Sequence, residues 1–157
     1  MSDLENTLLL ELKDGTVTIA LRPDLAPQHV SRIKELARQG YYDGLNFHRV
    51  IPGFMAQGGC PDGNGTGGSG QNLPAEFSRE SHVEGTCSMA RAGHPDSADS
   101  QFFICFEPAP HLDGQYTVWG QVTDGMTHVH SITKGGGANG TVTDPDKIIS
   151  MKVAADA

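Results

Sequence analysis

The feature that most limits how this chain can fold is a series of short β-prone runs, each ended by a turn. Leucines recur with a period of two at Leu8, Leu10 and Leu12, and apolar residues do so again over 17–21, with Asp14-Gly15 between the two runs. Alternation with a period of two indicates half-buried strands, and an Asp-Gly pair between them indicates a hairpin. The same reasoning predicts a strand that begins at Asn46 and further strands over 86–92, 100–106, 116–122 and 147–153.

Two segments show helical spacing instead. Apolar residues recur at a helical period over 30–37, which predicts a helix from Pro27 to Gln39 with Gly40 as its left-handed cap. Residues 126–132 predict a second helix of about ten residues, ended by Gly135 to Gly137. Hairpins and loops join the strands, so we expect an antiparallel sheet closed on itself, with helices over its ends.

Length and composition fit one globular domain over residues 1–157. The formal net charge of -8 argues against general binding to nucleic acid. No apolar run approaches the roughly 20 residues of a membrane-spanning helix. Acidic residues precede the first Leu run, the wrong charge for a secretory signal, so we expect a cytoplasmic location. Three cysteines without a CxxC pair indicate neither a disulfide framework nor a zinc ribbon.

The stretch NFHRVIPGFMAQGG, residues 46–59, places Arg49 among large apolar residues. Removing water from a charge is costly, so a buried arginine needs a partner. One interpretation is a structural ion pair or a side chain whose charged end reaches solvent. The other is a shallow apolar pocket with one strong hydrogen-bond donor at its wall. The sequence pattern around Arg49 is compatible with both.

A glycine-rich segment follows, with seven glycines between Gly58 and Gly70. Such a composition predicts a surface loop rather than core. It lacks the Gly-Lys-Ser/Thr ending of a phosphate-binding P-loop, and no helical pattern follows it. A flexible loop whose backbone can approach a ligand closely is the better interpretation.

Common catalytic and metal-binding patterns are missing from the sequence. It contains no HExxH, no GxSxG and no paired carboxylates in an apolar setting. His48 and Arg49 are adjacent in a predicted strand and therefore point to opposite faces. The other histidines are scattered, and each is expected to be a surface residue or a hydrogen-bonded core residue. Hydrolase and metalloenzyme hypotheses thus lack a nucleophile, a base and a ligand set, and we expect neither metal nor cofactor.

The remaining chemistry-bearing residues are three donors and an apolar set. This combination can bind a peptide and assist rotation about an amide bond, whose barrier is about 20 kcal/mol. A guanidinium aimed at the amide nitrogen stabilises the twisted state more than the planar one, and an apolar pocket can hold the proline ring. A peptide-binding module without catalysis is the alternative. The donors are Arg49, Gln57 and Gln101, and the apolar set is Phe54, Met55, Phe103, Leu112 and Tyr116.

Five motifs in register show that the chain resembles a cyclophilin, and more narrowly the compact bacterial cytosolic type. They are residues 46–59, NGTGG at 64–68, SMARAG at 88–93, SQFFI at 100–104 and HLDGQYTVWGQV at 111–122. The resemblance covers nearly the whole chain. It implies a mainly β fold, a closed eight-stranded antiparallel barrel capped by two helices. It also implies peptidyl-prolyl cis-trans isomerase activity without a cofactor.

The resemblance also implies a role for each matching residue. Arg49 is the expected catalytic arginine, and Gln57 is expected in the hydrogen-bonded network around it. The proline pocket is expected to be lined by Phe54, Met55, Phe103 and Leu112. Residues of the substrate before the proline are expected to lie against Gly65, Ala90, Arg91, Ala92 and Gln101, with the backbone of Arg91 holding the substrate chain.

Three positions differ from the best-known eukaryotic pattern. His111 stands where tryptophan is common, Tyr116 where histidine is common, and Arg91 where asparagine is common. Isomerisation should survive, because the arginine and the apolar floor remain. Cyclosporin binding is expected to be weak, since the missing tryptophan normally donates a hydrogen bond to that drug. The expected partners are proline-containing peptides and unfolded or partly folded proteins, and the expected state is a monomer.

Overall fold

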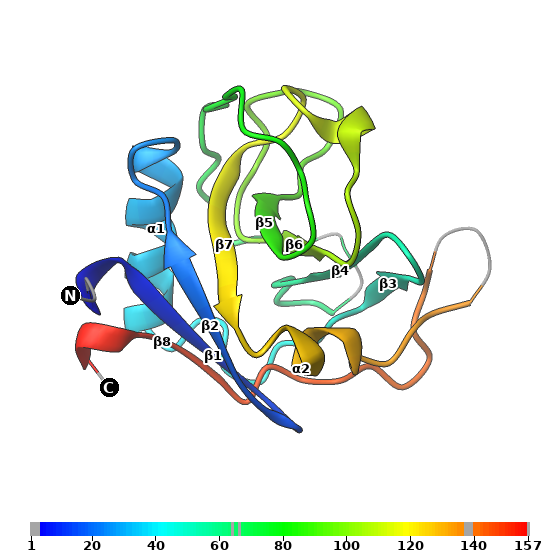
Figure 1. The fold of residues 1–157 in the computed structure, drawn as a ribbon. Coiled ribbons are helices and arrows are strands. Elements are labelled where there is room, and N and C mark those ends of the chain that lie inside the picture. Colours follow the sequence, from blue (N-terminus) through cyan, green and yellow to red (C-terminus); the bar gives the residue numbers. More distant parts are fainter. Residues whose placement is uncertain (1–3, 64, 66, 137–139, 157) are drawn as a thin grey trace.

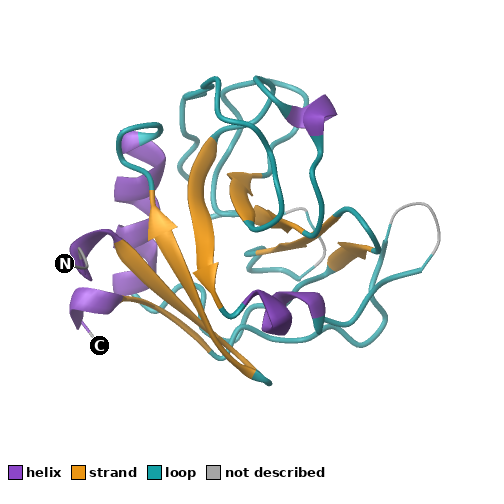
Figure 2. Ribbon diagram, viewed as in Figure 1, coloured by secondary structure: helices purple, strands orange, loops and turns teal. Residues whose placement is uncertain are grey.

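The computed structural model describes residues 4–63, 65, 67–136 and 140–156. Within these residues short strands dominate and two α-helices flank them (Figures 1 and 2). The strands are β1 (Thr7–Leu12), β2 (Gly15–Leu21), β3 (Arg49–Ile51), β4 (Met55–Gly58), β5 (Thr86–Met89), β6 (Phe102–Cys105), β7 (Val118–Asp124) and β8 (Ser150–Val153). The helices are α1 (Pro27–Arg38) and α2 (Met126–His130), with single 3-10 turns at Leu4–Asn6, Pro110–Leu112 and Ala154–Asp156.

The strands form one antiparallel sheet in the order β3-β4-β6-β5-β7-β2-β1-β8. The sheet curls into an open half-barrel with β3 and β8 at its edges (Figure 1). The prediction of a closed barrel is therefore wrong, although the prediction of eight antiparallel strands and two helices is confirmed.

The two edges fail to pair for a local reason. β3 does not pair with β8 itself. Among the described residues Arg49 of β3 bridges to Thr141, which precedes β8 in the chain, and Asn46 bridges to Lys147. Phe47 N donates to Asp146 O at 2.9 Å beside it. Pro145 follows the glycine-rich approach to β8 and has no N–H to donate, so a regular ladder cannot continue there.

The predicted helix α1 agrees closely with the structure, and Gly40 has the expected positive φ of 72°. The predicted strands are longer than the observed ones at several ends; the strand expected from Asn46 begins at Arg49. Leu12 pairs with Gly15, so the first hairpin turns at Lys13 and Asp14, one residue earlier than predicted.

The second helix also differs, since it spans five residues instead of about ten. It begins after Gly125, which has a φ of 84°, and its C-cap is Ser131. Apolar spacing continues to Ile132, which is buried, but the chain leaves the helix before it. Gly137, the last residue of the predicted glycine stop, lies outside the described residues.

The two faces of the sheet bury two separate apolar clusters. Phe102 and Ile104 belong to the main core, whereas Phe103 and Cys105 belong to a second cluster with Met55, Ala109 and Leu112. This confirms the predicted division of β6 into two faces. Because both faces of β6 are covered, all four of its residues are buried. The second cluster is the one that positions the candidate site.

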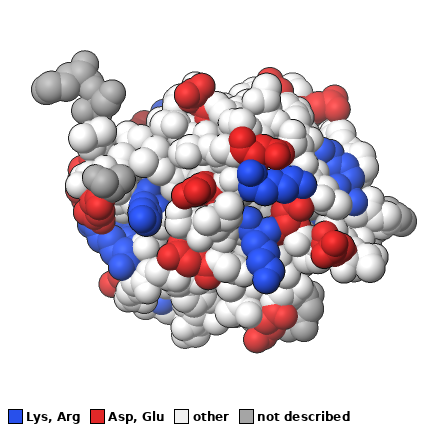
Figure 3. Space-filling view, turned by 90° about the horizontal axis from the view of Figure 1, so that it is seen from below, with Lys and Arg blue, Asp and Glu red and all other residues white. Residues whose placement is uncertain are grey.

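Acidic and basic side chains are intermixed on the surface, and no described helix could span a membrane. None of the helices described is long and apolar enough to cross a bilayer. On the face shown in Figure 3, basic and acidic side chains are interspersed. Arg38, for example, contacts both Glu5 and Asp156. Ion pairs of this exposed kind contribute little to stability.

Candidate functional site

Strand register brings Arg49, Gln57 and Phe103 side by side. Arg49 on β3 pairs with Gln57 on β4, and Gln57 pairs with Phe103 on β6. Phe103 in turn pairs with Ser88 on β5. Directly opposite residues in antiparallel strands share a face. The four residues therefore form a row across four strands, on the face opposite the main core.

A chain of side-chain hydrogen bonds orients the guanidinium of Arg49. Its Nη1 donates to Gln57 Oε1 at 3.1 Å, and Gln57 Nε2 donates to Gln101 Oε1 at 3.0 Å. Gln101 Nε2 then donates to the carbonyl oxygens of Gly65 and Gly67 at 2.9 and 3.0 Å. Two backbone carbonyls of the glycine-rich segment thus determine the direction of both amides and of the arginine.

An apolar hollow of about 330 Å³ lies beside Arg49. Its floor is nearly inaccessible, since Met55, Phe103 and Leu112 are 2%, 5% and 7% exposed. The Phe103 and Tyr116 rings meet edge to face with centroids 5.7 Å apart. The lining residues are Arg49, Phe54, Met55, Gln57, Ala90, Arg91, Phe103, His111, Leu112 and Tyr116.

A polar groove of about 290 Å³ adjoins the hollow and shares three lining residues with it: Gln57, Ala90 and Arg91. Every site residue predicted from the sequence lines either the hollow or the groove. The groove is lined by Gln57, Gly65, Gly67, Gly68, Asn72, Ala90, Arg91, Ala92, Ser97, Asp99 and Gln101. Asn64 and Thr66 of the NGTGG motif lie outside the described residues.

Sequence reasoning missed Asn72, Ser97 and Asp99 in this groove. Asp99 Oδ1 accepts from Ser69 N at 2.7 Å, and Asp99 Oδ2 accepts from Gly70 N at 3.0 Å. The carboxylate thereby holds the glycine-rich segment against the chain before β6. An acidic residue next to a polar turn was the only signal for this contact in the sequence, and it does not identify a partner 30 residues away.

The side chain of Arg91 contacts the residues that form one side of the hollow. Its Nε and Nη2 donate to Gln115 O at 3.1 and 2.9 Å. The guanidinium carbon lies 4.8 Å from the centroid of the Tyr116 ring, within range of a cation–π contact. Arg91 thus supports a wall residue in addition to lining the site.

Three histidines are buried, and burial lowers the pKa of each. For His48 the nearby charge of Arg49 also lowers the pKa, whereas Glu76 opposes the effect at His29 and Asp113 opposes it at His82. His29 and His82 confirm the expectation of hydrogen-bonded core histidines. His111 instead is exposed at the rim, 5.4 Å from the Phe54 ring.

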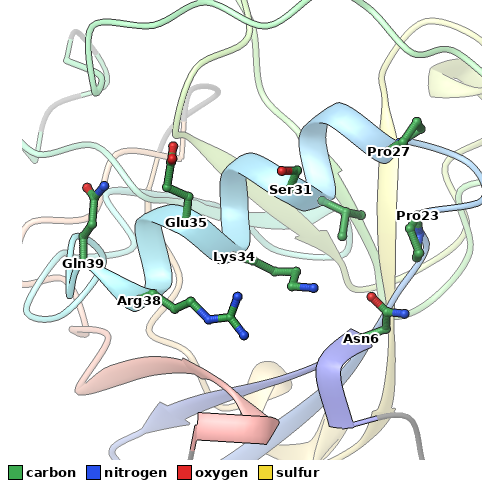
Figure 4. Close-up of a pocket in the computed structure, with 9 residues that line it drawn as sticks. Asn6, Pro23, Pro27, Ser31, Lys34, Glu35, Arg38 and Gln39 are labelled. Atoms are coloured by element: carbon green, nitrogen blue, oxygen red, sulfur yellow. The ribbon is translucent and has the colours of Figure 1, made fainter.

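Another hollow, of about 550 Å³, runs along α1 (Figure 4). Lys34 and Arg38 at its side both contact Glu5, at 2.8 and 2.9 Å. It contains none of the site residues predicted from the sequence and has little apolar lining besides Val30 and two prolines. We therefore place the candidate site at the hollow beside Arg49.

The site offers binding and two guanidinium groups held by hydrogen bonds, those of Arg49 and Arg91, rather than covalent chemistry. The residues that line the hollow include no Ser, Cys, Asp or Glu. Ser88, the last residue of the row, is fully buried and bonded to His82 and to Thr117 O. Within the described chain, no group of three or more His, Cys, Asp or Glu side chains could hold a metal ion. The hollow can seat a small apolar ring with a donor beside it.

Comparisons with known proteins identify the family to which the chain is similar. The family model described as "Cyclophilin type peptidyl-prolyl cis-trans isomerase/CLD" matches residues 7–153. A probable peptidyl-prolyl cis-trans isomerase of Brucella suis is 55% identical over 99% of this chain and 86% of its own length. Peptidyl-prolyl cis-trans isomerase B of Bacillus subtilis is 48% identical over 79% of this chain and 88% of its own.

Solved structures give the same result. A cyclophilin of Hirschia baltica has a TM-score of 0.87 at 27% identity, covering 99% of this chain and 76% of its own. A cyclophilin-type isomerase of Cryptosporidium parvum, solved in the presence of the dipeptide Ala-Pro, has a TM-score of 0.85 at 27% identity, covering 94% of this chain and 98% of its own. These matches confirm the resemblance seen in the sequence motifs: the chain belongs to the family of cyclophilin-type peptidyl-prolyl cis-trans isomerases.

Proposed function

We propose that this chain catalyses cis–trans isomerisation of X-Pro peptide bonds with Arg49 as the catalytic residue. The observation that carries the proposal is the position of the Arg49 guanidinium at the wall of an apolar hollow floored by Met55, Phe103 and Leu112. A hollow of about 330 Å³ can accept a proline ring. The Cryptosporidium parvum relative was solved in the presence of an Ala-Pro dipeptide, which supports the same class of ligand.

The reaction needs a donor more than a nucleophile. Peptide bonds are planar because the nitrogen lone pair is delocalised, and rotation must overcome about 20 kcal/mol. In the twisted state this lone pair is localised on the proline nitrogen, which becomes a better hydrogen-bond acceptor. A guanidinium N–H directed at that nitrogen therefore stabilises the transition state more than either planar isomer. The apolar hollow holds the ring while the acyl side rotates.

Gln57 acts with Arg49 in this proposal. Its Oε1 accepts from Arg49 Nη1 at 3.1 Å, and because the guanidinium is a planar fork, this bond helps to fix the direction of the whole group. Gln101 fixes Gln57 in the same way and is itself held by the Gly65 and Gly67 carbonyls. An oriented donor costs little reorganisation when charge develops, which favours catalysis.

The polar groove is the proposed position of the residues before the proline. It leads away from the hollow between the glycine-rich segment and the segment after β5, so an extended peptide with its proline in the hollow can continue along it. Gly65 and Ala92 are exposed there, and small side chains allow close approach of two backbones. Ala90, Arg91 and Gln101 complete the proposed contacts.

Replacing Arg49 tests the mechanism. We expect Arg49→Ala to lower kcat/KM about ten- to hundredfold, the value of one charge-assisted hydrogen bond of about 1.5–3 kcal/mol. Arg49→Lys should also be slow, because an ammonium group cannot reproduce the planar fork. A protease-coupled assay on an Ala-Pro peptide measures the rate. Activity of Arg49→Ala equal to that of the wild type would contradict the role of Arg49.

Exchange NMR on the same peptide separates catalysis from binding alone. A catalyst produces exchange peaks between the cis and trans forms, whereas a binding module shifts the peaks without mixing the isomers. Arg49→Ala should still shift the peptide peaks, because the apolar hollow remains. This outcome would assign isomerisation to the guanidinium and ring binding to the hollow.

The proposal extends to clients and location. The clients would be proline-containing segments of unfolded or partly folded proteins, whose X-Pro bonds isomerise slowly. The chain would act as a monomer in the cytoplasm. Its three free cysteines support the location, since reduced thiols are typical of that compartment. Sedimentation would test the monomer and cell fractionation the location.

A further inference from the structure

The segment that forms one wall of the hollow has little regular structure. We call residues 109–117 the wall segment. It carries His111, Leu112 and Tyr116 into the hollow, yet its only regular element is the 3-10 turn Pro110–Leu112. A segment without a strand ladder needs other contacts to define its position. The hydrogen bonds that hold this segment therefore determine the distance between its side chains and Phe103 on the floor of the hollow.

His82 supplies the anchors in the first half of this segment. Its backbone N–H donates to Asp113 Oδ1 at 2.7 Å, and its Nδ1 lies 3.0 Å from the same oxygen. Its carbonyl oxygen accepts from Ala109 N at 2.9 Å. His82 thus binds the wall segment at both sides of Leu112.

The ring of His82 also contacts the floor and the sheet. It stacks on Phe103 with an interplanar angle of 16° and centroids 6.1 Å apart. Its Nε2 lies 3.0 Å from Ser88 Oγ, in the strand next to Phe103. His82 is 1% exposed, so water does not compete for these contacts. One buried side chain therefore joins the wall, the floor and β5.

The contacts define how the protons are arranged. A carboxylate can only accept, so Nδ1 of His82 carries a hydrogen and donates to Asp113. Burial lowers the pKa of His82 and favours the neutral ring. The Ser88 hydroxyl has one hydrogen and lies within hydrogen-bond distance of both His82 Nε2 and Thr117 O, so it donates to one of them at a time. In this state residue 113 needs to provide an acceptor oxygen but not a negative charge.

We infer that His82 and Asp113 are positioning residues of the isomerase, which hold Leu112 and Tyr116 at the correct distance from Phe103 to grip the proline ring. The inference rests on the proposed function, in which the hollow is the proline pocket. Neither residue lines the hollow, and neither touches the substrate in this proposal. Their effect would pass through the wall segment and, for His82, also through the stacked ring of Phe103.

Asp113→Ala is the central test, because Asp113 is partly exposed and its removal opens no core cavity. We expect the Kd for an Ala-Pro peptide to rise about tenfold, equivalent to about 1.4 kcal/mol. The isomerisation rate of the bound peptide should change little, since ring binding is lost equally in the planar and twisted states. Exchange NMR with peptide titration measures both quantities on the same sample.

Asp113→Asn provides the conservative comparison. The amide oxygen can still accept from the His82 backbone N–H and from Nδ1–H, so we expect its Kd to stay close to that of the wild type. A variant that merely loses fold stability would instead show a smaller active fraction with an unchanged Kd. Asp113→Asn that binds as weakly as Asp113→Ala would overturn the acceptor role of residue 113.

Two further variants make the test decisive. His29→Asn removes another fully buried histidine, which lies on α1 outside the hollow and is bonded to Glu76, and this variant should leave the Kd unchanged. Leu112→Ala removes an apolar lining residue of the hollow and should weaken binding if the hollow is the proline pocket. Weakened binding by Leu112→Ala with unchanged binding by Asp113→Ala would refute the positioning role alone. Unchanged binding by both would refute the location of the pocket.

Discussion

At the scale of single residues, Arg49 owes its position to its neighbours in adjacent strands. The sequence left open whether this cation forms a structural pair or serves a pocket. The structure gives it a fixed acceptor in Gln57 and an apolar hollow beside it. Arg49 is partly exposed, so the charge keeps some hydration while its direction is defined. A charge in this setting can be useful without the full cost of burial.

The three buried histidines predict how stability depends on pH. Burial lowers the pKa values of His29, His48 and His82 in the folded state, while in the unfolded chain they titrate near 6.5. Below that value the unfolded state binds more protons, so the free energy of unfolding falls as pH decreases. We expect urea unfolding to show lower stability at pH 5.5 than at pH 7.5.

The histidine effect can be distinguished from that of carboxylates. The pKa of Asp113 is lowered, chiefly because its carboxylate accepts a hydrogen bond from the His82 backbone N–H. The contribution of Asp113 to the free energy of unfolding is therefore lost only as pH falls below the usual carboxyl range near 4. His29→Asn should reduce the slope of stability against pH between about 7 and 5. A free energy of unfolding that stays constant down to pH 4.5 would contradict this account.

At the scale of secondary-structure elements, helix α1 shows a tertiary contribution that its own sequence does not contain. Ala26 at its N-cap provides no side-chain hydrogen bond. Glu76, from the long connection between β4 and β5, accepts from Gln28 N at 3.2 Å and from His29 N at 2.9 Å. A carboxylate at this end also interacts favourably with the helix dipole. The helix is thus capped by a residue remote in sequence.

Removing this remote cap should destabilise the fold. We expect Glu76→Ala to lower the free energy of unfolding by about 1–2 kcal/mol, the cost typical of a lost N-cap. Urea unfolding monitored by circular dichroism measures the change. Glu80→Ala is the matched control: its carboxylate pairs with Arg22 at the surface, and its loss should cost less than about 0.5 kcal/mol. Equal effects of the two variants would argue against capping by Glu76.

At the scale of the whole molecule, the sheet separates two apolar clusters that need not open together. Cys87 lies in the main core, and Cys105 lies in the second cluster beneath the wall segment. Burial raises the pKa of both thiols, that of Cys105 to about 12. Because the thiolate is the reactive form, both should react only after the structure opens.

Thiol labelling should therefore report the two clusters separately. We expect Cys105 to react with an aromatic disulfide reagent faster than Cys87, since Cys105 lies in the smaller cluster, whose wall segment has a single 3-10 turn as its regular structure. A saturating Ala-Pro peptide should slow the labelling of Cys105 selectively, because binding stabilises the closed wall. Mass spectrometry of the labelled peptides measures both rates. Equal rates, with or without the peptide, would show that the molecule opens as one unit.

Much of this protein could be predicted from local pattern. Alternation in residues 100–106 correctly divided Phe102 from Phe103, and helical spacing located α1 within one residue. These features depend on neighbours a few residues apart, where the periods of strands and helices apply directly. Motifs also identified the family, and every predicted site residue lines the hollow or the groove.

Other features were decided only by the tertiary structure. Strand register placed Arg49, Gln57 and Phe103 in one row, and it bonded Gln57 to Gln101 across 44 residues. The open edge between β3 and β8 and the contact of His82 with Asp113 are of the same kind. The reason is physical: local periodicity states which face a residue occupies, but hydrogen bonds between distant strands and loops decide what lies opposite it.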